Sequence, residues 1–205
     1  VRASAVIIMD RLEQNQLQAE VLQKIAEDID RLAAPGFDAT VNFRNKLQDG
    51  FRSSQLTLKS SYYDKKNQKR IYEEIIWQTD YDPDRGTLKL YRLHGGLNVE
   101  DKVLEPDPKN SENTDFFVPV ASGVTYFEIR SQQGENILGA WTSEKLPKAV
   151  RVGISFELQQ ELPDGSIDVP EESVHYRTIA IERTRFIPYQ FVKKEFDVPE
   201  EPNEL

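Results

Sequence analysis

Three aspartates at alternate positions, Asp80, Asp82 and Asp84, form the arrangement in this sequence that comes nearest to a metal site. Alternating acids open a calcium-binding loop, because carboxylate oxygens are the ligands that Ca²⁺ prefers. The rest of the loop does not fit: the glycine falls one place late, at Gly86, and Tyr91 stands where a bidentate acid is needed. We therefore predict a hairpin turn with no metal ligand and no cofactor, and keep calcium at these aspartates as the alternative.

The two histidines, His94 and His175, stand in unrelated segments. Because the chain has no cysteine, a zinc site would need carboxylates from distant places to complete it. The sequence contains no serine-nucleophile motif, phosphate-binding glycine loop or metalloprotease motif. We predict no catalytic residue and no metal ligand at either histidine.

Adjacent carboxylates occur at Glu73-Glu74 and at Glu171-Glu172. A pair of carboxylates can carry out acid–base catalysis, but neighbouring residues of a strand point to opposite faces and cannot converge on one substrate. We predict that both pairs are solvated surface and that the chain is not an enzyme. A hydrolase built on scattered carboxylates is the alternative.

Aromatic residues in strand-like segments could line a sugar-binding surface. Aromatic side chains in strands more often pack in a core or against a neighbouring strand, and we predict that role here. A β-rich carbohydrate-binding module is the alternative. The residues concerned are Trp77, Tyr81, Tyr126, Phe127 and Trp141.

The chain of 205 residues is acidic, with 35 Asp and Glu against 26 Lys and Arg and a formal net charge of -9. A negative protein repels phosphate backbones, which argues against nucleic acid as a partner. The longest apolar run of the N-terminal segment, Ala5 to Met9, is far shorter than the roughly eighteen residues needed to cross a bilayer.

The N-terminal segment, about residues 3–34, contains neither glycine nor proline and is rich in helix-forming residues, so it predicts one long helix. Pro35 and Gly36 mark its end. Spacings of three and four place an apolar stripe on its second half, for packing on a core. The stripe consists of Leu22, Ile25, Ile29 and Leu32, with Ala19 and Ala33 extending it.

The remainder of the chain switches to the alternation of period two that strands require. Residues 69–96 predict a hairpin whose turn is the stretch from Asp82 to Gly86, with Leu88, Leu90 and Leu93 giving the returning strand one apolar face. Later strands are expected around 116–120, 124–130, 149–158 and 174–186. A polar connection, 100–115, is predicted to be a surface loop.

A long helix followed by strands predicts an α+β fold, with the helix laid across an antiparallel sheet. We expect one domain over residues 1–192, because splitting the chain would leave two small cores. The last residues, 193–205, carry acids and prolines with few apolar anchors and are expected to be a disordered tail.

The helix end VLQKIAEDIDRLAAPGF, the hairpin strand LKLYRLHGG, the stretch from Val124 to Leu158 and YRTIAIERTRF together resemble the pilin-like proteins, and specifically the minor pseudopilin J family of type II secretion systems. The stretch WTSEKLPKAVR, Trp141 to Arg151, carries the most specific likeness. The resemblance extends from the helix to about Phe191. It implies a pilin-like fold with a long N-terminal α-helix packed on antiparallel sheet.

The resemblance also implies a structural role. Such a protein joins the minor pseudopilins I, K and H at the tip of a short periplasmic filament that supports export of folded proteins across the outer membrane. The full-length protein would be anchored in the inner membrane by an N-terminal segment, with this domain in the periplasm. No cofactor and no nucleic-acid partner is implied.

The beginning of the sequence departs from this family, whose members carry a basic leader and then an apolar segment with a glutamate at mature position five. We expect the helix to be the remaining part of a longer one. Val6, Ile7, Ile8 and Met9 are too apolar to face water and are predicted to bind partner helices. A frayed helix end is the alternative interpretation of these four residues, and a minor pilin of a type IV pilus is the nearest alternative function.

Overall fold

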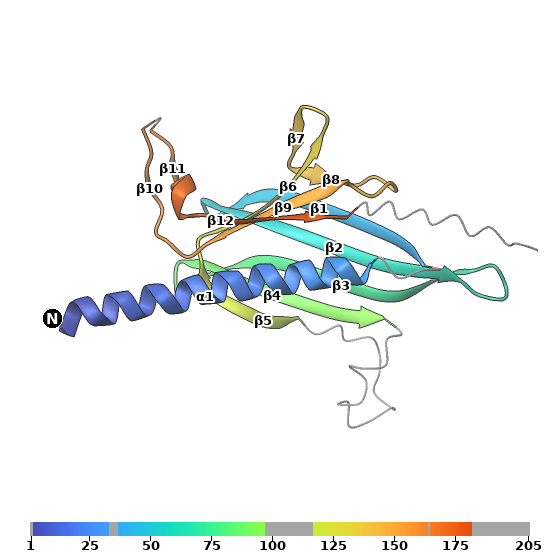
Figure 1. Ribbon diagram of the computed structural model, residues 1–205, viewed down its shortest axis with the longest axis horizontal. Helices are drawn as coiled ribbons and strands as arrows, with labels where there is room; N and C mark the ends of the chain where they lie inside the picture. Colours follow the sequence, from blue (N-terminus) through green and yellow to red (C-terminus); the bar gives the residue numbers. More distant parts are fainter. Residues whose placement is uncertain (1, 33–36, 97–116, 164, 182–205) are drawn as a thin grey trace, which may run out of the picture.

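The computed structural model describes residues 2–32, 37–96, 117–163 and 165–181, with side chains from residue 13 onward. The predicted connection 100–115 and the predicted tail 193–205 lie outside these residues. Within them, one helix α1 (Arg2–Arg31) precedes a large sheet (Figure 1). The larger strands are β1 (Asp38–Gln48), β2 (Phe51–Tyr63), β3 (Lys69–Asp82), β4 (Thr87–Gly96), β5 (Val118–Val124), β6 (Tyr126–Gln133), β9 (Ala149–Ser155) and β12 (His175–Ala180). The shorter elements are β7 (Asn136–Leu138), β8 (Ala140–Trp141), β10 (Gln160–Glu161), β11 (Ile167–Asp168) and the 3₁₀ helix η2 (Glu171–Ser173).

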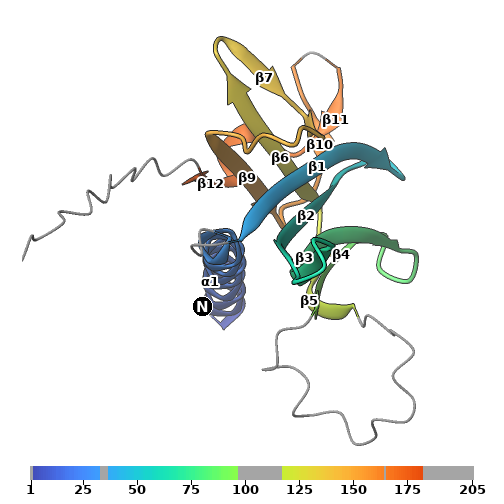
Figure 2. The same ribbon diagram turned by 90° about the vertical axis from the view of Figure 1, so that its right-hand side faces the viewer.

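The main sheet has the strand order β12-β9-β6-β2-β3-β4-β5; in addition, β1 pairs with β2, β8 pairs with β1, and β7 pairs with β6. Most neighbours are antiparallel, but β6 joins β2 as a parallel pair at Arg52 and Tyr126. The view close to the helix axis shows the sheet curling, with α1 on its concave side (Figure 2). The core is the layer of apolar side chains between α1 and this side.

The predicted fold class, α+β and pilin-like with antiparallel sheet, is wrong. Among the residues whose side chains are described, strands make up 59% and helix 15%, so the fold is mostly β. The sheet is curled and mixed, because the chain returns to β2 in parallel through β6 after building β3, β4 and β5. Such a return joins segments far apart in the sequence, and local alternation cannot reveal it.

The described part of α1 contributes one stripe to the core. Leu22, Ile25, Ile29 and Leu32 are all buried, as their spacing predicts. Ala19 is exposed, contrary to expectation, and Gln18 and Val21 are buried in its place. The buried stripe therefore begins at Gln18, one residue before the Ala19 that the apolar pattern predicts. Ala33 lies outside the described residues.

The hairpin of β3 and β4 is present as predicted, with Asp82 opposite Thr87. Its turn is closed by the Gly86 N–H, which donates to the Asp82 carbonyl oxygen at 2.9 Å, and Gly86 takes φ +62°. One detail is wrong: Leu88 and Leu90 share a face of β4 with Arg92, whereas Leu93 points to the other face. A charged side chain thus occupies the core-facing position where we expected an apolar one.

Candidate functional site

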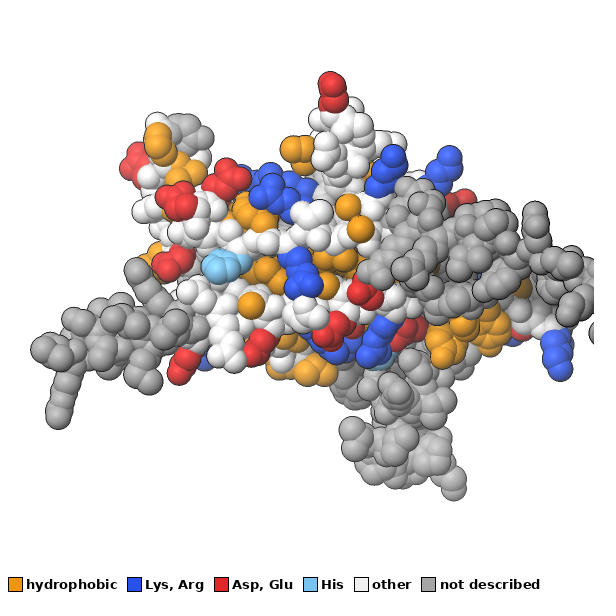
Figure 3. All heavy atoms as spheres, viewed as in Figure 1, with side chains coloured by type: hydrophobic (Ala, Val, Ile, Leu, Met, Phe, Trp, Pro, Cys, Tyr) orange, Lys and Arg blue, Asp and Glu red, His pale blue; other side chains and the backbone are white. Residues whose placement is uncertain are grey.

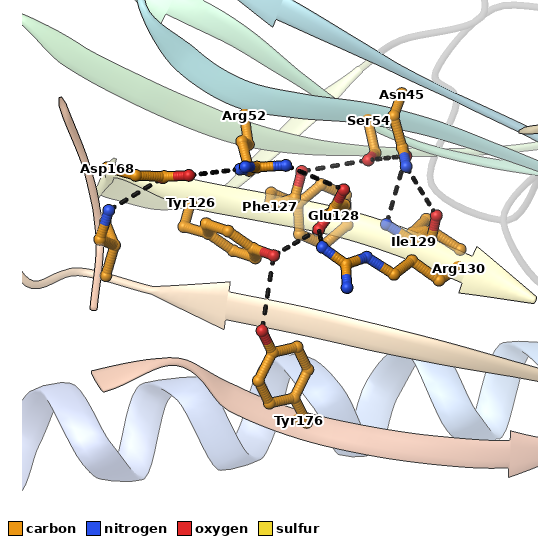
Figure 4. Close-up of polar contacts among 11 residues, drawn as sticks. Asn45, Arg52, Ser54, Tyr126, Phe127, Glu128, Ile129, Arg130, Asp168 and Tyr176 are labelled. Atoms are coloured by element: carbon orange, nitrogen blue, oxygen red, sulfur yellow. Dashed lines mark hydrogen bonds and ion pairs between the residues drawn. The ribbon is translucent and has the colours of Figure 1, made fainter. Parts of the chain in front are cut away.

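The outer face of β6 carries a connected group of ionisable side chains. Phe127 and Ile129 are fully buried in the core, so alternation along the strand places Tyr126, Glu128 and Arg130 on the opposite face (Figure 4). This cluster, the β6 cluster, is completed by Arg52 of β2, Asp168 of β11 and Tyr176 of β12. Side chains of β2 and of the β11 to β12 region, far apart in the sequence, therefore meet at β6.

The Glu128 carboxylate lies at the centre of the β6 cluster and is nearly buried, at 9% exposure. Its Oε2 is 2.6 Å from Nη2 of Arg130 and also accepts the hydroxyl hydrogen of Tyr126. Its Oε1 is 3.4 Å from Nη1 of Arg52. Two guanidinium groups and a phenol thus compensate a carboxylate that would otherwise be costly to bury.

Arg52 connects this carboxylate to the small β10–β11 hairpin. Its Nε donates to Oδ2 of Asp168 at 2.6 Å. Partial burial by itself lowers the pKa of Arg52, but the hydrogen bond and charge of Asp168, helped by Glu128, outweigh it and leave the pKa raised. Arg52 therefore stays charged and ties β11 to β2 and β6.

Two tyrosines, Tyr126 and Tyr176, form the other side of the β6 cluster, and both rings lie close to Gly153. The hydroxyl oxygens of Tyr126 and Tyr176 are 3.5 Å apart. Gly153 lies beneath both rings: a Cβ there would come within 2.6 Å of Cε1 of Tyr176 and 3.2 Å of Cε1 of Tyr126. Above Tyr176, the Cζ of Arg151 is 3.8 Å from the ring centroid, a cation–π contact. Val169 and Val174 pack against Tyr126 and cover the rings.

The geometry of the β6 cluster suits a structural contact that holds a neighbouring segment against the sheet. Burial, reinforced by the hydrogen bond and the charge of Glu128, raises the pKa of Tyr126 well above its ordinary value of 10.0, so the phenol stays protonated. Glu128 is held by the two arginines Arg52 and Arg130. The arrangement holds the segment from β10 to η2 against the sheet.

We expect the stability of the protein to fall as the pH rises above about 10, because the unfolded chain then loses the Tyr126 proton while the folded chain keeps it. The contribution of Tyr126 is complete below that pH and is lost above it. Replacing Tyr126 with Phe should flatten this alkaline decrease, as measured by urea unfolding between pH 8 and pH 11. An unchanged slope in the variant would contradict the assignment.

A second buried cluster joins the helix to the sheet. Asp28 of α1 is fully buried, and its Oδ2 accepts hydrogen bonds from Nε1 of Trp77 and from Nε of Arg92, both at 2.8 Å. Nη2 of Arg92 donates to the other carboxylate oxygen at 2.9 Å. This two-point contact fixes the rotation of α1 over β3 and β4.

The carboxylates singled out in the sequence do not converge. Glu73 is buried and lies 2.7 Å from Nε2 of His94 and 3.6 Å from Arg31, whereas Glu74 pairs with Lys59 at 2.8 Å. The expectation of solvated surface is therefore wrong for Glu73. Glu171 and Glu172 are exposed as expected, but they lie in η2, not in a strand.

The alternating aspartates serve the hairpin turn. Oδ1 of Asp82 accepts the backbone N–H of Asp84 at 3.1 Å, and Oδ1 of Asp80 accepts a hydrogen bond from Gln48 at 2.7 Å. Within residues 13–181, as far as they are described, no three His, Asp or Glu side chains lie close enough to hold a metal ion. His175 is exposed on β12.

The aromatic residues proposed for a sugar surface are mostly inside the protein. Trp77, Phe127 and Tyr126 are buried, and Tyr81 stacks on Phe51 at a centroid distance of 6.2 Å. Trp141 is partly exposed, and its Nε1 donates to the Lys145 carbonyl oxygen at 2.8 Å. These positions do not form a shared platform.

The predicted partner-binding residues Val6, Ile7, Ile8 and Met9 lie on α1, but their side chains fall outside the described residues. In the described part of the chain, no helix is long and apolar enough to cross a membrane. No protein-family model matches the sequence, and no curated protein matches it either.

Proposed function

We propose that this chain is a structural subunit, a minor pseudopilin of the type II secretion pseudopilus tip complex that supports export of folded proteins across the outer membrane. The observation that carries the proposal is the N-terminal end of α1, which projects beyond the sheet (Figure 1). The apolar residues Ala5 to Met9 belong to this projecting end. A projecting apolar helix end suits packing against helices of sister subunits.

The other end of the same helix is anchored. The contact of Asp28 with Trp77 and Arg92 and the buried stripe from Val21 to Leu32 hold it on the sheet. A helix that is fixed on the sheet at one end and projects beyond it at the other can transmit the position of a partner helix to the sheet. This division of roles supports an assembly subunit.

The sequence stretch most similar to the pseudopilin J family has a defined structure. Trp141 bonds back to the Lys145 carbonyl oxygen, and Leu146 packs against the main core. The chain then enters β9 at Ala149. The stretch therefore forms a connection from β8 to β9 that is held by Trp141 and Leu146.

The proposal predicts that the chain forms a complex with the periplasmic domains of its cognate I and K subunits. Replacing Ile7 and Met9 together with Asp should weaken this complex by about tenfold or more, because two charges would enter an apolar contact. Light scattering of the mixtures measures association, and circular dichroism checks that the variant melts like the parent.

The matched control places the same two charges at exposed positions of the same helix, Gln16→Asp and Gln23→Asp. This control should associate like the parent. Equal association of the Ile7 and Met9 variant would contradict the helix contact. Association with type IV pilus subunits in place of I and K would favour the alternative of a minor pilin.

A further inference from the structure

The end of the β2–β3 hairpin concentrates positive charge on an otherwise acidic protein. Between Tyr62 and Tyr72, a segment that we call the β2–β3 tip, four basic residues accompany the single acid Asp64. The basic residues are Lys65, Lys66, Lys69 and Arg70. The whole chain has a net charge of -9, whereas the tip carries a local excess of positive charge.

Asp64 fixes the conformation of the turn at the β2–β3 tip through its hydrogen bonds. Its Oδ1 accepts the backbone N–H groups of Lys66 and Gln68, both at 2.9 Å. The Asp64 N–H donates to the Gln68 carbonyl oxygen at 3.0 Å, and Asn67 takes the left-handed φ of 56°. The hydrogen bonds that its carboxylate accepts, the one from the Gln68 N–H first, lower the pKa of Asp64 and favour its charged form. A preformed loop loses less entropy on binding.

Two apolar side chains are exposed beside these charges. Tyr63 is 57% exposed and Ile71 is 44% exposed. The strand register puts Tyr63 opposite Lys69 and Ile71 opposite Ser61, so both apolar residues share one face. At the base of the tip the ring of Phe37 lies 4.5 Å from Tyr72 and 6.2 Å from Tyr62, between centroids. These rings give the tip a rigid support.

Two of the four basic side chains at the tip lie near carboxylates, and the other two do not. Arg70 is 3.1 Å from Asp64, and Lys69 is 3.8 Å from Asp38. Lys65 and Lys66 are exposed and contact no carboxylate within the described segments. The two unpaired ammonium groups are therefore free to attract an anion.

We propose that the β2–β3 tip docks an acidic segment of a partner protein, with Lys65 and Lys66 pairing its carboxylates and Tyr63 and Ile71 packing on its apolar side chains. That the partner is a further component of an assembly rests on the proposed function. Tyrosine is enriched in protein interfaces, and complementary charges around an apolar contact speed association and select the partner.

An anionic membrane fits the tip less well. Each lysine near such a surface strengthens binding only about fivefold, and two free lysines give weak attachment. The tip also lies at the end of the molecule opposite the N-terminus of α1, the end that the proposed function assigns to the membrane side (Figure 1). The space-filling view shows hydrophobic side chains towards this end, with a basic side chain beyond them (Figure 3).

The test uses the full chain and a fluorescein-labelled peptide made of Glu, Asp and Leu. We expect binding by fluorescence anisotropy that weakens as salt is added, and at least about a tenfold loss of affinity in the Lys65→Glu/Lys66→Glu variant. The variant Tyr63→Ser/Ile71→Ser should also bind more weakly. The control Lys145→Glu/Lys148→Glu makes the same charge change at exposed positions elsewhere and should bind like the parent.

Equal binding of the parent and the Lys65 and Lys66 variant would overturn the proposal, as would equal binding of a peptide with Gln and Asn in place of its acids. Flotation with phosphatidylglycerol vesicles, without affinity for the acidic peptide, would assign the tip to a membrane surface and also overturn it. The Ile7→Asp/Met9→Asp variant should keep its peptide affinity. The peptide experiment can therefore contradict the proposed docking by the tip without contradicting the proposed function, and the subunit-association experiment can do the reverse.

Discussion

Replacing Asp28 with Ala is expected to lower the free energy of unfolding by about 3–5 kcal/mol, the usual effect of removing one partner from a buried ion pair. The substitution leaves the Arg92 guanidinium, whose side chain is only 17% exposed, without its carboxylate. It also leaves Nε1 of the fully buried Trp77 without an acceptor. Urea unfolding at neutral pH, monitored by tryptophan fluorescence, measures the loss.

Two variants give this prediction its controls. Glu27→Ala removes an exposed acid of the same helix, 3.7 Å from Lys24, and should change stability by less than about 1 kcal/mol. The double variant Asp28→Leu/Arg92→Leu removes both charges, so its loss should be smaller than that of Asp28→Ala. Equal losses in Asp28→Ala and Glu27→Ala would show that the contact does not hold the helix.

Replacing Gly153 with Val should destabilise the protein by about 1–3 kcal/mol through overpacking. Valine normally favours a strand, by up to about 1 kcal/mol, so a loss requires a specific obstacle. The obstacle is Tyr176, whose Cε1 would lie 2.6 Å from the new Cβ. Displacing this ring would also remove it from the hydroxyl of Tyr126.

A double-mutant cycle separates this cause from a general effect on β9. In a Tyr176→Ala background the shortest contact of the new Cβ is gone and only Cε1 of Tyr126, at 3.2 Å, remains close, so the same change to Val should cost less. Near-ultraviolet circular dichroism should also show loss of the tyrosine signal in the single variant. Additive costs in the two backgrounds would exclude the ring contact as the reason for the glycine.

Much of the local structure could be predicted from the sequence. The helix stripe depends on a spacing of three and four, and the β3–β4 hairpin depends on alternation around a turn with Gly86. Both are determined by neighbours in the chain. Asp28 illustrates the limit: the helical period places it on the stripe between Ile25 and Leu32, but the pattern was read for apolar residues only. A buried acid at such a position requires a cation. Alternation along β4 places Arg92 on the face that is turned towards the helix, where it can supply that cation.

The β6 cluster could not be predicted in this way. Arg52, Glu128 and Asp168 come from segments that meet only through the parallel joining of β2 and β6. Alternation places Glu128 on the face opposite Phe127, but it does not tell which strands cover that face. The one local signal was Gly153, because a glycine inside a strand often marks a close approach of another group.

The single parallel pair of Arg52 with Tyr126 also bears on the order of folding. On either side of it the sheet consists of antiparallel strands, β2 to β5 in one lobe and β6, β9 and β12 in the other. Each lobe closes mostly through pairings nearer in the chain, whereas the joining pair requires a long loop to be closed first. Because α1 contacts β9 and β12 in one lobe and its Asp28 bonds Trp77 of β3 and Arg92 of β4 in the other, we expect the two lobes to unfold together as one cooperative unit.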